Sequence, residues 1–309
     1  MGLLDVWFSR FLEKKLKKIA ICSILIGLCV PLQSWAGNAR GYKPFPEGTF
    51  LFCTYFKHFS ANNMYAANKK ISSDLNLSSN IGIFRPVYYK KIGKALYGEG
   101  DFIVNPQIFM MFGDRDMALG GEALSDSGFF DPMILATFWF VSAPEKKLWI
   151  GFSPYVTIPV GSYHTNRSLN LGENRWTIKP EIGIVKGFGE DLFLDFIMNI
   201  KFHADNDEFF SGQKRVKKSQ SDLFGLETHL SYNLKKEFFV SLDYFFNSGG
   251  ETEIDGIRKR DKQENHAIGA SMFWSLKNNQ QIMIEYLNNF DIESGAKTQT
   301  LGIRWSYFL

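Results

Sequence analysis

The chain has 309 residues with 35 basic and 32 acidic side chains, so its formal net charge is only +3. Residues 1–36 carry five of the bases and two of the acids, which leaves 30 charges of each sign in residues 37–309 and gives no argument for nucleic acid as a partner. Cys53 is the one cysteine after residue 36, so the sequence excludes an internal disulfide there.

The first 36 residues have the pattern of a secretory signal peptide. A basic stretch at 14–18 precedes an apolar run at 19–32, and Ser34 and Ala36 supply small residues before a cleavage site. The apolar run is shorter than the roughly 20 residues that a membrane helix needs. We therefore expect a signal peptide at 1–36, cleavage before Gly37, and a single domain at 37–309 that crosses a membrane by strands.

Alternation of apolar and polar residues with a period of two predicts about twelve strands in residues 37–309. The strands are expected near 50–60, 77–90, 101–112, 130–142, 147–160, 176–187, 191–203, 221–233, 237–248, 265–276, 280–290 and 298–309. The last of them ends with Trp305 and Tyr307 alternating with polar residues, as a membrane strand does at its aromatic girdle.

The connections between these strands alternate in length. Short ones fall at 143–146, 188–190, 234–236 and 277–279, and long polar ones at 161–175, 204–220 and 248–264. Short periplasmic turns and long external loops are typical of outer-membrane barrels, which must close because hydrocarbon does not tolerate an open sheet edge. The predicted fold is all-β: an antiparallel up-and-down transmembrane β-barrel of about 12 strands in the outer membrane of a Gram-negative bacterium. The alternative is a soluble periplasmic barrel or sandwich.

Charged residues in these strands share one face. In the strand at 191–203, Asp195 and Lys201 have the parity opposite to Leu194. A basic residue facing lipid at the midplane costs about 2 to 4 kcal/mol, so the charged face is expected to line the lumen. The lumen candidates are Lys179, Glu181, Asp195, Lys201, Glu227, His229, Asp243, Glu285 and Arg304.

Such a mixed set could form ion pairs that fill a closed interior, or line a wet path whose field selects solutes. A layer of Trp139, Trp149 and Tyr155 would narrow the lumen and favour flat or apolar solutes.

The long loop at 161–175 is the best candidate for a gate. Gly161 and Gly172 permit the tight turns that would let it fold inward. Its polar candidates are Asn166, Arg167, Glu173 and Arg175. The alternative is a rigid loop that only ties neighbouring strands together.

Motifs for other chemistry are sparse. His58 and Ser60 share a strand face, as do the His and Ser of a twelve-stranded outer-membrane phospholipase family, but the sequence assigns neither a third group nor an oxyanion stabiliser. The five histidines are dispersed, and His203 with Asp205 and Asp207 is the nearest approach to a cluster. No catalytic, cofactor or metal residue is therefore assigned.

Four segments resemble a known family: GFFDP at 128–132, PVGSY at 159–163, LNLGENRW at 169–176 and DND at 205–207. Together they resemble the outer-membrane family named "Putative MetA-pathway of phenol degradation", over residues 45–309. The resemblance implies a barrel and a role in uptake of small molecules, aromatic ones included, and it supplies no catalytic residues. The chain departs from the usual terminal Phe of outer-membrane strands by ending in Leu309, so the barrel assembly machinery would have to recognise Trp305, Tyr307 and Phe308.

The sequence therefore predicts a passive channel or transporter for small solutes, and aromatic or apolar compounds are the first candidates for the solute. The second hypothesis is a closed barrel that acts at the surface through its long loops, where the basic run at 214–218 could contact lipopolysaccharide phosphates. The third is a membrane-embedded hydrolase using His58 and Ser60. Expected partners are outer-membrane lipid and lipopolysaccharide, a small-molecule solute, and the assembly machinery during biogenesis.

Overall fold

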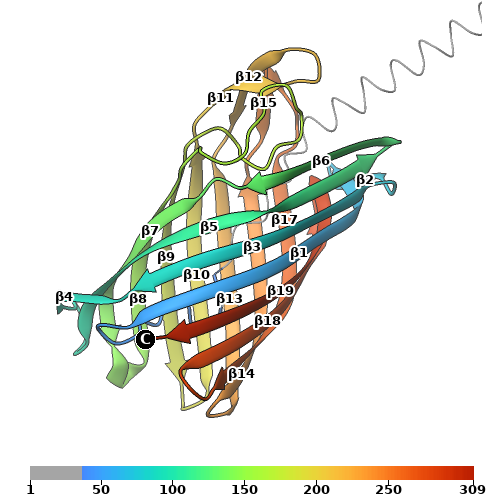
Figure 1. The fold of residues 1–309 in the computed structure, drawn as a ribbon. Helices are drawn as coiled ribbons and strands as arrows, with labels where there is room; N and C mark the ends of the chain where they lie inside the picture. Colours follow the sequence, from blue (N-terminus) through green and yellow to red (C-terminus); the bar gives the residue numbers. More distant parts are fainter. Residues whose placement is uncertain (1–36) are drawn as a thin grey trace, which may run out of the picture.

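Twelve long strands in the described part of the chain form one closed antiparallel barrel (Figure 1). The computed structural model describes residues 37–309, so the expected signal peptide lies outside the described residues. The barrel closes where the first strand pairs with the last, from Leu51 opposite Phe308 to Tyr65 opposite Gly295. The predicted fold class is confirmed. In order around the wall the strands are β1 (Phe50–Ala66), β3 (Asn76–Tyr88), β5 (Asp101–Leu119), β7 (Met133–Ala143), β8 (Leu148–Thr157), β9 (Thr177–Phe188), β10 (Leu192–His203), β13 (Leu223–Lys235), β14 (Phe238–Gly249), β17 (Gln263–Leu276), β18 (Gln280–Ile292) and β19 (Gly295–Phe308).

Two strands continue well past their expected ends. β1 reaches Ala66 and turns back as β2 (Lys69–Ser72), and β5 reaches Leu119 and turns back as β6 (Glu122–Phe129). The expected ends near 60 and 112 were wrong because the extensions are polar on their outer face, where the apolar alternation fades. β4 (Lys90–Lys94) pairs with the start of β5 at the opposite end of the barrel.

The long loops at 204–220 and 248–264 contain a small sheet of their own. It comprises β11 (Asn206–Phe210), β12 (Arg215–Gln220), β15 (Thr252–Ile254) and β16 (Ile257–Arg258). Figure 1 shows this sheet at the end opposite the C-terminus. The short turns, including the 3₁₀ turn η1 (Pro144–Lys146), lie at the C-terminal end, which is the periplasmic end of an outer-membrane barrel.

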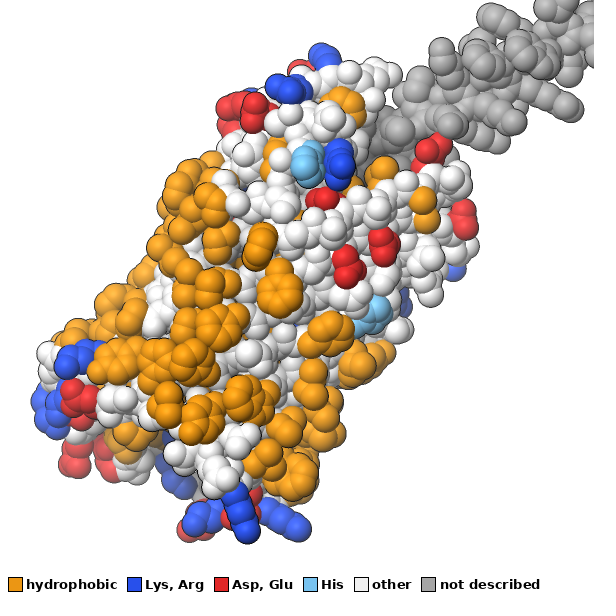
Figure 2. All heavy atoms as spheres, viewed as in Figure 1, with side chains coloured by type: hydrophobic (Ala, Val, Ile, Leu, Met, Phe, Trp, Pro, Cys, Tyr) orange, Lys and Arg blue, Asp and Glu red, His pale blue; other side chains and the backbone are white. Residues whose placement is uncertain are grey.

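The two faces of the wall differ as a membrane requires. On β10, Leu194, Phe196, Ile200 and Phe202 are exposed, whereas Phe193, Asp195, Ile197 and Asn199 are buried. Figure 2 shows apolar side chains gathered over the barrel strands and charged ones mostly toward the two ends. Within residues 37–309, no helix has the length and hydropathy of a transmembrane helix.

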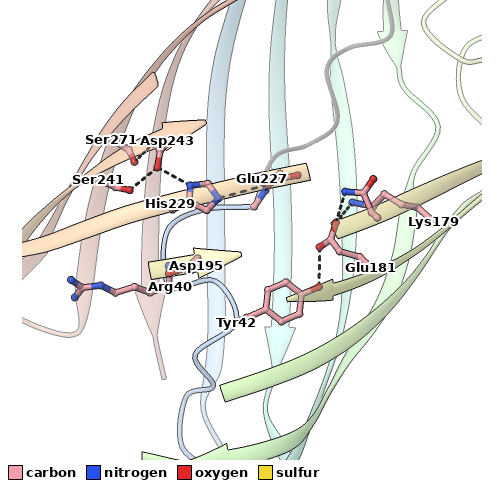
Figure 3. Close-up of polar contacts among 12 residues, drawn as sticks. Arg40, Tyr42, Lys179, Glu181, Asp195, Glu227, His229, Ser241, Asp243 and Ser271 are labelled. Carbon is pink, nitrogen blue, oxygen red and sulfur yellow. Dashed lines mark hydrogen bonds and ion pairs between the residues drawn. The ribbon is translucent and has the colours of Figure 1, made fainter. Parts of the chain in front are cut away.

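Residues 37–46, which precede β1, lie inside the barrel. They line the same internal cavity as inward-facing residues of the wall, among them Tyr55, Thr137 and Phe273. Figure 3 shows Arg40 and Tyr42 of this segment among the inward-facing side chains of the strands. Residues 37–46 are called the inner segment below.

Candidate functional site

Tyr42 anchors the inner segment to the middle of the lumen (Figure 3). Its hydroxyl lies 2.9 Å from Glu181 Oε1 and 2.8 Å from Ser153 Oγ. The indole Nε1 of Trp139, a fully buried side chain, donates to the backbone carbonyl of Tyr42 at 2.7 Å. Both ends of the tyrosine residue are therefore hydrogen bonded to the wall.

Two glycines make room for the Tyr42 ring. Gly151 and Gly183 face each other across β8 and β9. A Cβ on Gly183 would overlap the Tyr42 ring, and one on Gly151 would lie 3.0 Å from its Cδ1. Since protein interiors are close-packed, the absence of two side chains from this part of the wall fixes the place of the ring.

Arg40 anchors the segment nearer the periplasmic end. Its backbone N–H donates to Asp195 Oδ2 at 2.5 Å, while its guanidinium donates to Ser231 Oγ at 2.9 Å and to Asn233 Oδ1 at 2.7 Å. The guanidinium also lies 4.2 Å from the ring centroid of Phe193 and 4.0 Å from that of Phe239. Cation–π contacts of this kind add to the polar anchoring.

The start of the segment reaches a third group of wall residues. The Gly37 nitrogen donates to Glu227 Oε2 at 2.7 Å, and the Arg304 guanidinium donates to Asn38 Oδ1 at 3.0 Å. The inner segment is thus held at several levels along the barrel axis. Its partners in the wall lie more than 90 positions later in the sequence.

A buried row of charged and polar side chains lies on one side of the lumen. His229 Nδ1 lies 2.7 Å from Asp243 Oδ1, and His229 Nε2 lies 3.8 Å from Glu227 Oε2 (Figure 3). Ser241 and Ser271 donate to the two oxygens of Asp243 at 2.6 and 2.8 Å. Each residue faces the lumen from β13, β14 or β17, so the row crosses three neighbouring strands.

Two further buried ion pairs lie on the inner face of the wall. Lys179 Nζ lies 2.6 Å from Glu181 Oε2, and Tyr155 donates to Glu181 Oε1 at 3.1 Å. Lys57 Nζ lies 2.6 Å from Glu285 Oε1, joining β1 to β18 across β19. Both pairs are almost fully buried, so breaking either would leave an uncompensated charge inside the barrel.

A second cavity, of about 140 Å³, opens toward the extracellular side. Met111, Phe130, Met133 and Leu171 give it apolar walls. Its cationic lining includes Arg175, Lys179, Lys201 and Lys218, against the carboxylates Asp131 and Glu173. Tyr155 lines both this cavity and the larger periplasmic-side cavity of about 570 Å³, so it lies between them.

The loop between β8 and β9 covers this second cavity. Buried Asp131, just before β7, accepts the N–H groups of Gly161 at 2.8 Å and Glu173 at 2.7 Å. Asp126 on β6 accepts the N–H of Leu171 at 3.0 Å. Burial raises the pKa of Asp131 above its ordinary value, against the effect of these two N–H groups. The loop at residues 158–176 is therefore fixed to the wall by hydrogen bonds from its backbone N–H groups to the carboxylates of Asp126 and Asp131.

The four candidate gate residues are not equivalent. Arg175 is buried and donates to Glu173 Oε2 at 2.6 Å and to Gln220 Oε1 at 2.5 Å. Burial acts to raise the pKa of Glu173, but the charge of Arg175 outweighs it and holds the pKa below its ordinary range. Arg167 is exposed and lies 3.5 Å from Asp126 Oδ1, and Asn166 is exposed. Only Glu173 and Arg175 line the cavity.

The structure places all nine lumen candidates on the inner face. It brings Glu227, His229 and Asp243 together, and pairs Lys179 with Glu181. Asp195, Glu285 and Arg304 instead contact Arg40, Lys57 and Asn38, which were not among the candidates. The parity test would have found Lys57, since it follows the exposed Phe56; no periodic signal marks the inner segment.

His58 lies on the outer face of β1, with Nδ1 2.9 Å from Asn80 Oδ1, and Asn80 in turn donates to Asp114. Among the described residues the imidazole is hydrogen bonded to Asn80 and not to Ser60. A nucleophile and its base need that contact, so the polar row His58, Asn80 and Asp114 is a surface network without an activated serine. Residues 37–309 hold no group of three His, Cys, Asp or Glu side chains with the spacing of metal ligands.

A protein-family model described as "Putative MetA-pathway of phenol degradation" matches residues 61–307. The chain belongs to this family. An outer membrane channel from Pseudomonas putida F1 is 25% identical, with a TM-score of 0.80 over 87% of this chain and 98% of that one. The family and this likeness place the protein in the outer membrane of a Gram-negative bacterium, in a class of channel-type barrels.

More distant barrels share the fold alone. The transport unit of the autotransporter AIDA-I from Escherichia coli is 8% identical, with a TM-score of 0.52 over 92% of this chain and 94% of that one. The β domain of the Bordetella autotransporter BrkA is 9% identical, with a TM-score of 0.51 over 84% and 99%. Among curated protein sequences, none matches this chain.

Proposed function

We propose that this family member admits small solutes with an apolar, often aromatic body across the outer membrane, starting from the extracellular-side cavity. The observation that carries the proposal is the contrast inside the lumen. The inner segment lies in the periplasmic half and lines its larger cavity, anchored through Arg40 and Tyr42, whereas the smaller extracellular-side cavity has apolar walls that include Phe130 and Met133. An interior built in this way suits a selective path better than a wide general pore.

The charge of the cavity favours solutes that also carry an anionic group. Arg175 is paired with Glu173, and Lys179 with Glu181. Lys201 and Lys218 also line the cavity, and among the described residues no carboxylate lies within ion-pair distance of either ammonium group. A carboxylate on an aromatic ring could approach these two cations while the ring packs against Phe130 and Met133.

The test is conductance of the refolded barrel in planar bilayers with three solutes that share one ring: benzoate, benzyl alcohol and benzylammonium. We expect small current steps that benzoate blocks best and benzylammonium least. The variant Lys201→Met with Lys218→Met should reduce this preference, while Lys262→Met, at an exposed residue before β17, serves as the control. Equal block by all three solutes would reject the anion preference, and a large unselective conductance would reject the selective path.

The second hypothesis, a closed barrel acting at the surface, has one supporting observation: the separate sheet of β11, β12, β15 and β16 at the extracellular end. Its basic run is already partly neutralised, because Lys214 lies 2.7 Å from Asp255 and Lys217 lies 2.5 Å from Asp205. These pairs leave less charge for lipopolysaccharide phosphates, so the channel hypothesis is favoured. A correctly folded barrel that passes no current and no solute would reverse that order.

A further inference from the structure

The nitrogen of Gly37 lies deep in the barrel, at the position where the sequence predicts the mature chain to begin. It is 2.7 Å from Glu227 Oε2, and Glu227 itself is only 2% exposed. Hydrolysis of the peptide bond between Ala36 and Gly37 would give the hydroxyl of water to Ala36 and a hydrogen to the Gly37 nitrogen. The resulting amine takes up a proton at neutral pH, so processing would replace one N–H donor with an ammonium group.

We propose that removal of the signal peptide fixes the inner segment in the lumen, because the new α-ammonium of Gly37 forms a buried ion pair with Glu227. The site is created by processing, and its ligand is the chain's own N-terminus. The inference goes beyond solute passage: it concerns when and by what contact the inner segment becomes fixed.

Among the described residues, the one possible cation within ion-pair distance of Glu227 is His229, whose Nε2 lies 3.8 Å from Oε2 and whose Nδ1 contacts Asp243. The nearby guanidinium groups of Arg40 and Arg304 donate to Ser231, Asn233 and Asn38 instead. In the described residues, Glu227 Oε1 is buried without a hydrogen-bond partner. An amide N–H can serve one oxygen only, whereas an ammonium has three donors and a full charge for both oxygens.

The position tolerates little change in length or size. A Cβ on residue 37 would lie 3.0 Å from Ile197 Cδ1 and 3.2 Å from Glu227 Oε2, so the space suits glycine. Arg40 and Tyr42 fix the segment three and five residues further on. One additional residue would carry the charge about 3.5 Å away from its present position, beyond hydrogen-bond distance of Glu227.

The first experiment is the intact mass of the protein purified from outer membranes, which should correspond to residues 37–309. The second compares refolded barrels that begin at Gly37 or at Ala36, each with Glu227 or with Glu227→Gln. An Ala39→Cys reporter in a Cys53→Ser background shows how often the inner segment leaves the lumen, through its rate of maleimide labelling. Ala39 is buried against Phe273 and Met283, so labelling requires displacement.

We expect labelling of the barrel beginning at Gly37 to be slowest. The additional Ala36 and the Glu227→Gln variant should each raise the labelling rate about tenfold, the usual effect of losing a hydrogen bond to a charged group. Combining the two should add little, because both remove the same contact. Glu190→Gln, on an exposed periplasmic turn, is the control and should change nothing. Heat-modifiable gel mobility identifies the folded barrels.

Three results would overturn the proposal. The first is a native chain that begins at a residue other than Gly37. The second is equal labelling of the Gly37 and Ala36 barrels, which would show that the position of the terminal charge does not matter. The third is labelling raised additively by the two changes, which would assign Glu227 a role separate from the N-terminus. None of these readouts depends on which solute the protein carries.

Discussion

The two halves of the lumen are closed in different ways. The periplasmic half is occupied by a segment from before the first strand, whose partners Glu181, Asp195 and Glu227 lie 139 to 190 positions away in the sequence. The extracellular half is covered by the loop between β8 and β9, which Asp126 and Asp131 hold from 30 to 45 positions away. The loop connects two strands of the wall, whereas the inner segment lies in the lumen. The two should therefore respond differently to substitution.

Deleting residues 37–46 should have the largest effect on the periplasmic half. The wall closes between β1 and β19 from Phe50 onward, so the barrel should still fold, and bilayer conductance should rise several-fold. Deleting residues 165–173 tests the extracellular half in the same assay and should change conductance less while the inner segment remains. If the first deletion leaves conductance unchanged, the inner segment does not limit the path.

Gly183→Val should displace the Tyr42 ring without shortening the chain. The new side chain would occupy the position of the ring, so the inner segment should be released and conductance should approach that of the deletion. Gly93→Val is the matched control, because a Cβ there meets no atom within 4 Å. Normal conductance in folded Gly183→Val barrels would contradict the role of this glycine.

Asp131→Ala should loosen the extracellular closure. The carboxylate accepts two backbone N–H groups of the loop, and each such bond is worth about 1.5 to 3 kcal/mol. Trypsin should therefore cut after Arg167 faster than in the parent protein. Asp207→Ala, at an exposed residue, is the control, and equal rates in all three proteins would show that Asp131 does not fix the loop.

The smallest effect is expected outside the lumen. His58→Ala with Ser60→Ala should change neither conductance nor phospholipid turnover, because the imidazole contacts Asn80 rather than the serine. The measurement is release of fatty acid from labelled phospholipid by the purified barrel. A hydrolytic activity that this double variant abolishes would revive the hydrolase hypothesis.

The wall and the inner segment also differ in how far the sequence predicts them. The strands and their faces follow from local alternation, as for Asp195 and Lys201 on β10, and the glycines at 161 and 172 marked a loop able to turn inward. The inner segment has no such signal: Gly37 and Tyr42 acquire their partners only when β8, β9 and β13 stand around one lumen. Contacts of that range depend on the closed barrel and cannot be read from neighbouring residues.

The inner segment is joined to the barrel at one end only. Its C-terminal end continues into β1 at the periplasmic rim, and with cleavage after Ala36 its other end would be a chain terminus held by non-covalent contacts alone. It could then swing out into the periplasm and return without breaking a single hydrogen bond between barrel strands. The free energy of opening would then be set by the few contacts of residues 37–46 with the lumen, and the hydrogen-bond ladder of the wall would not contribute to it.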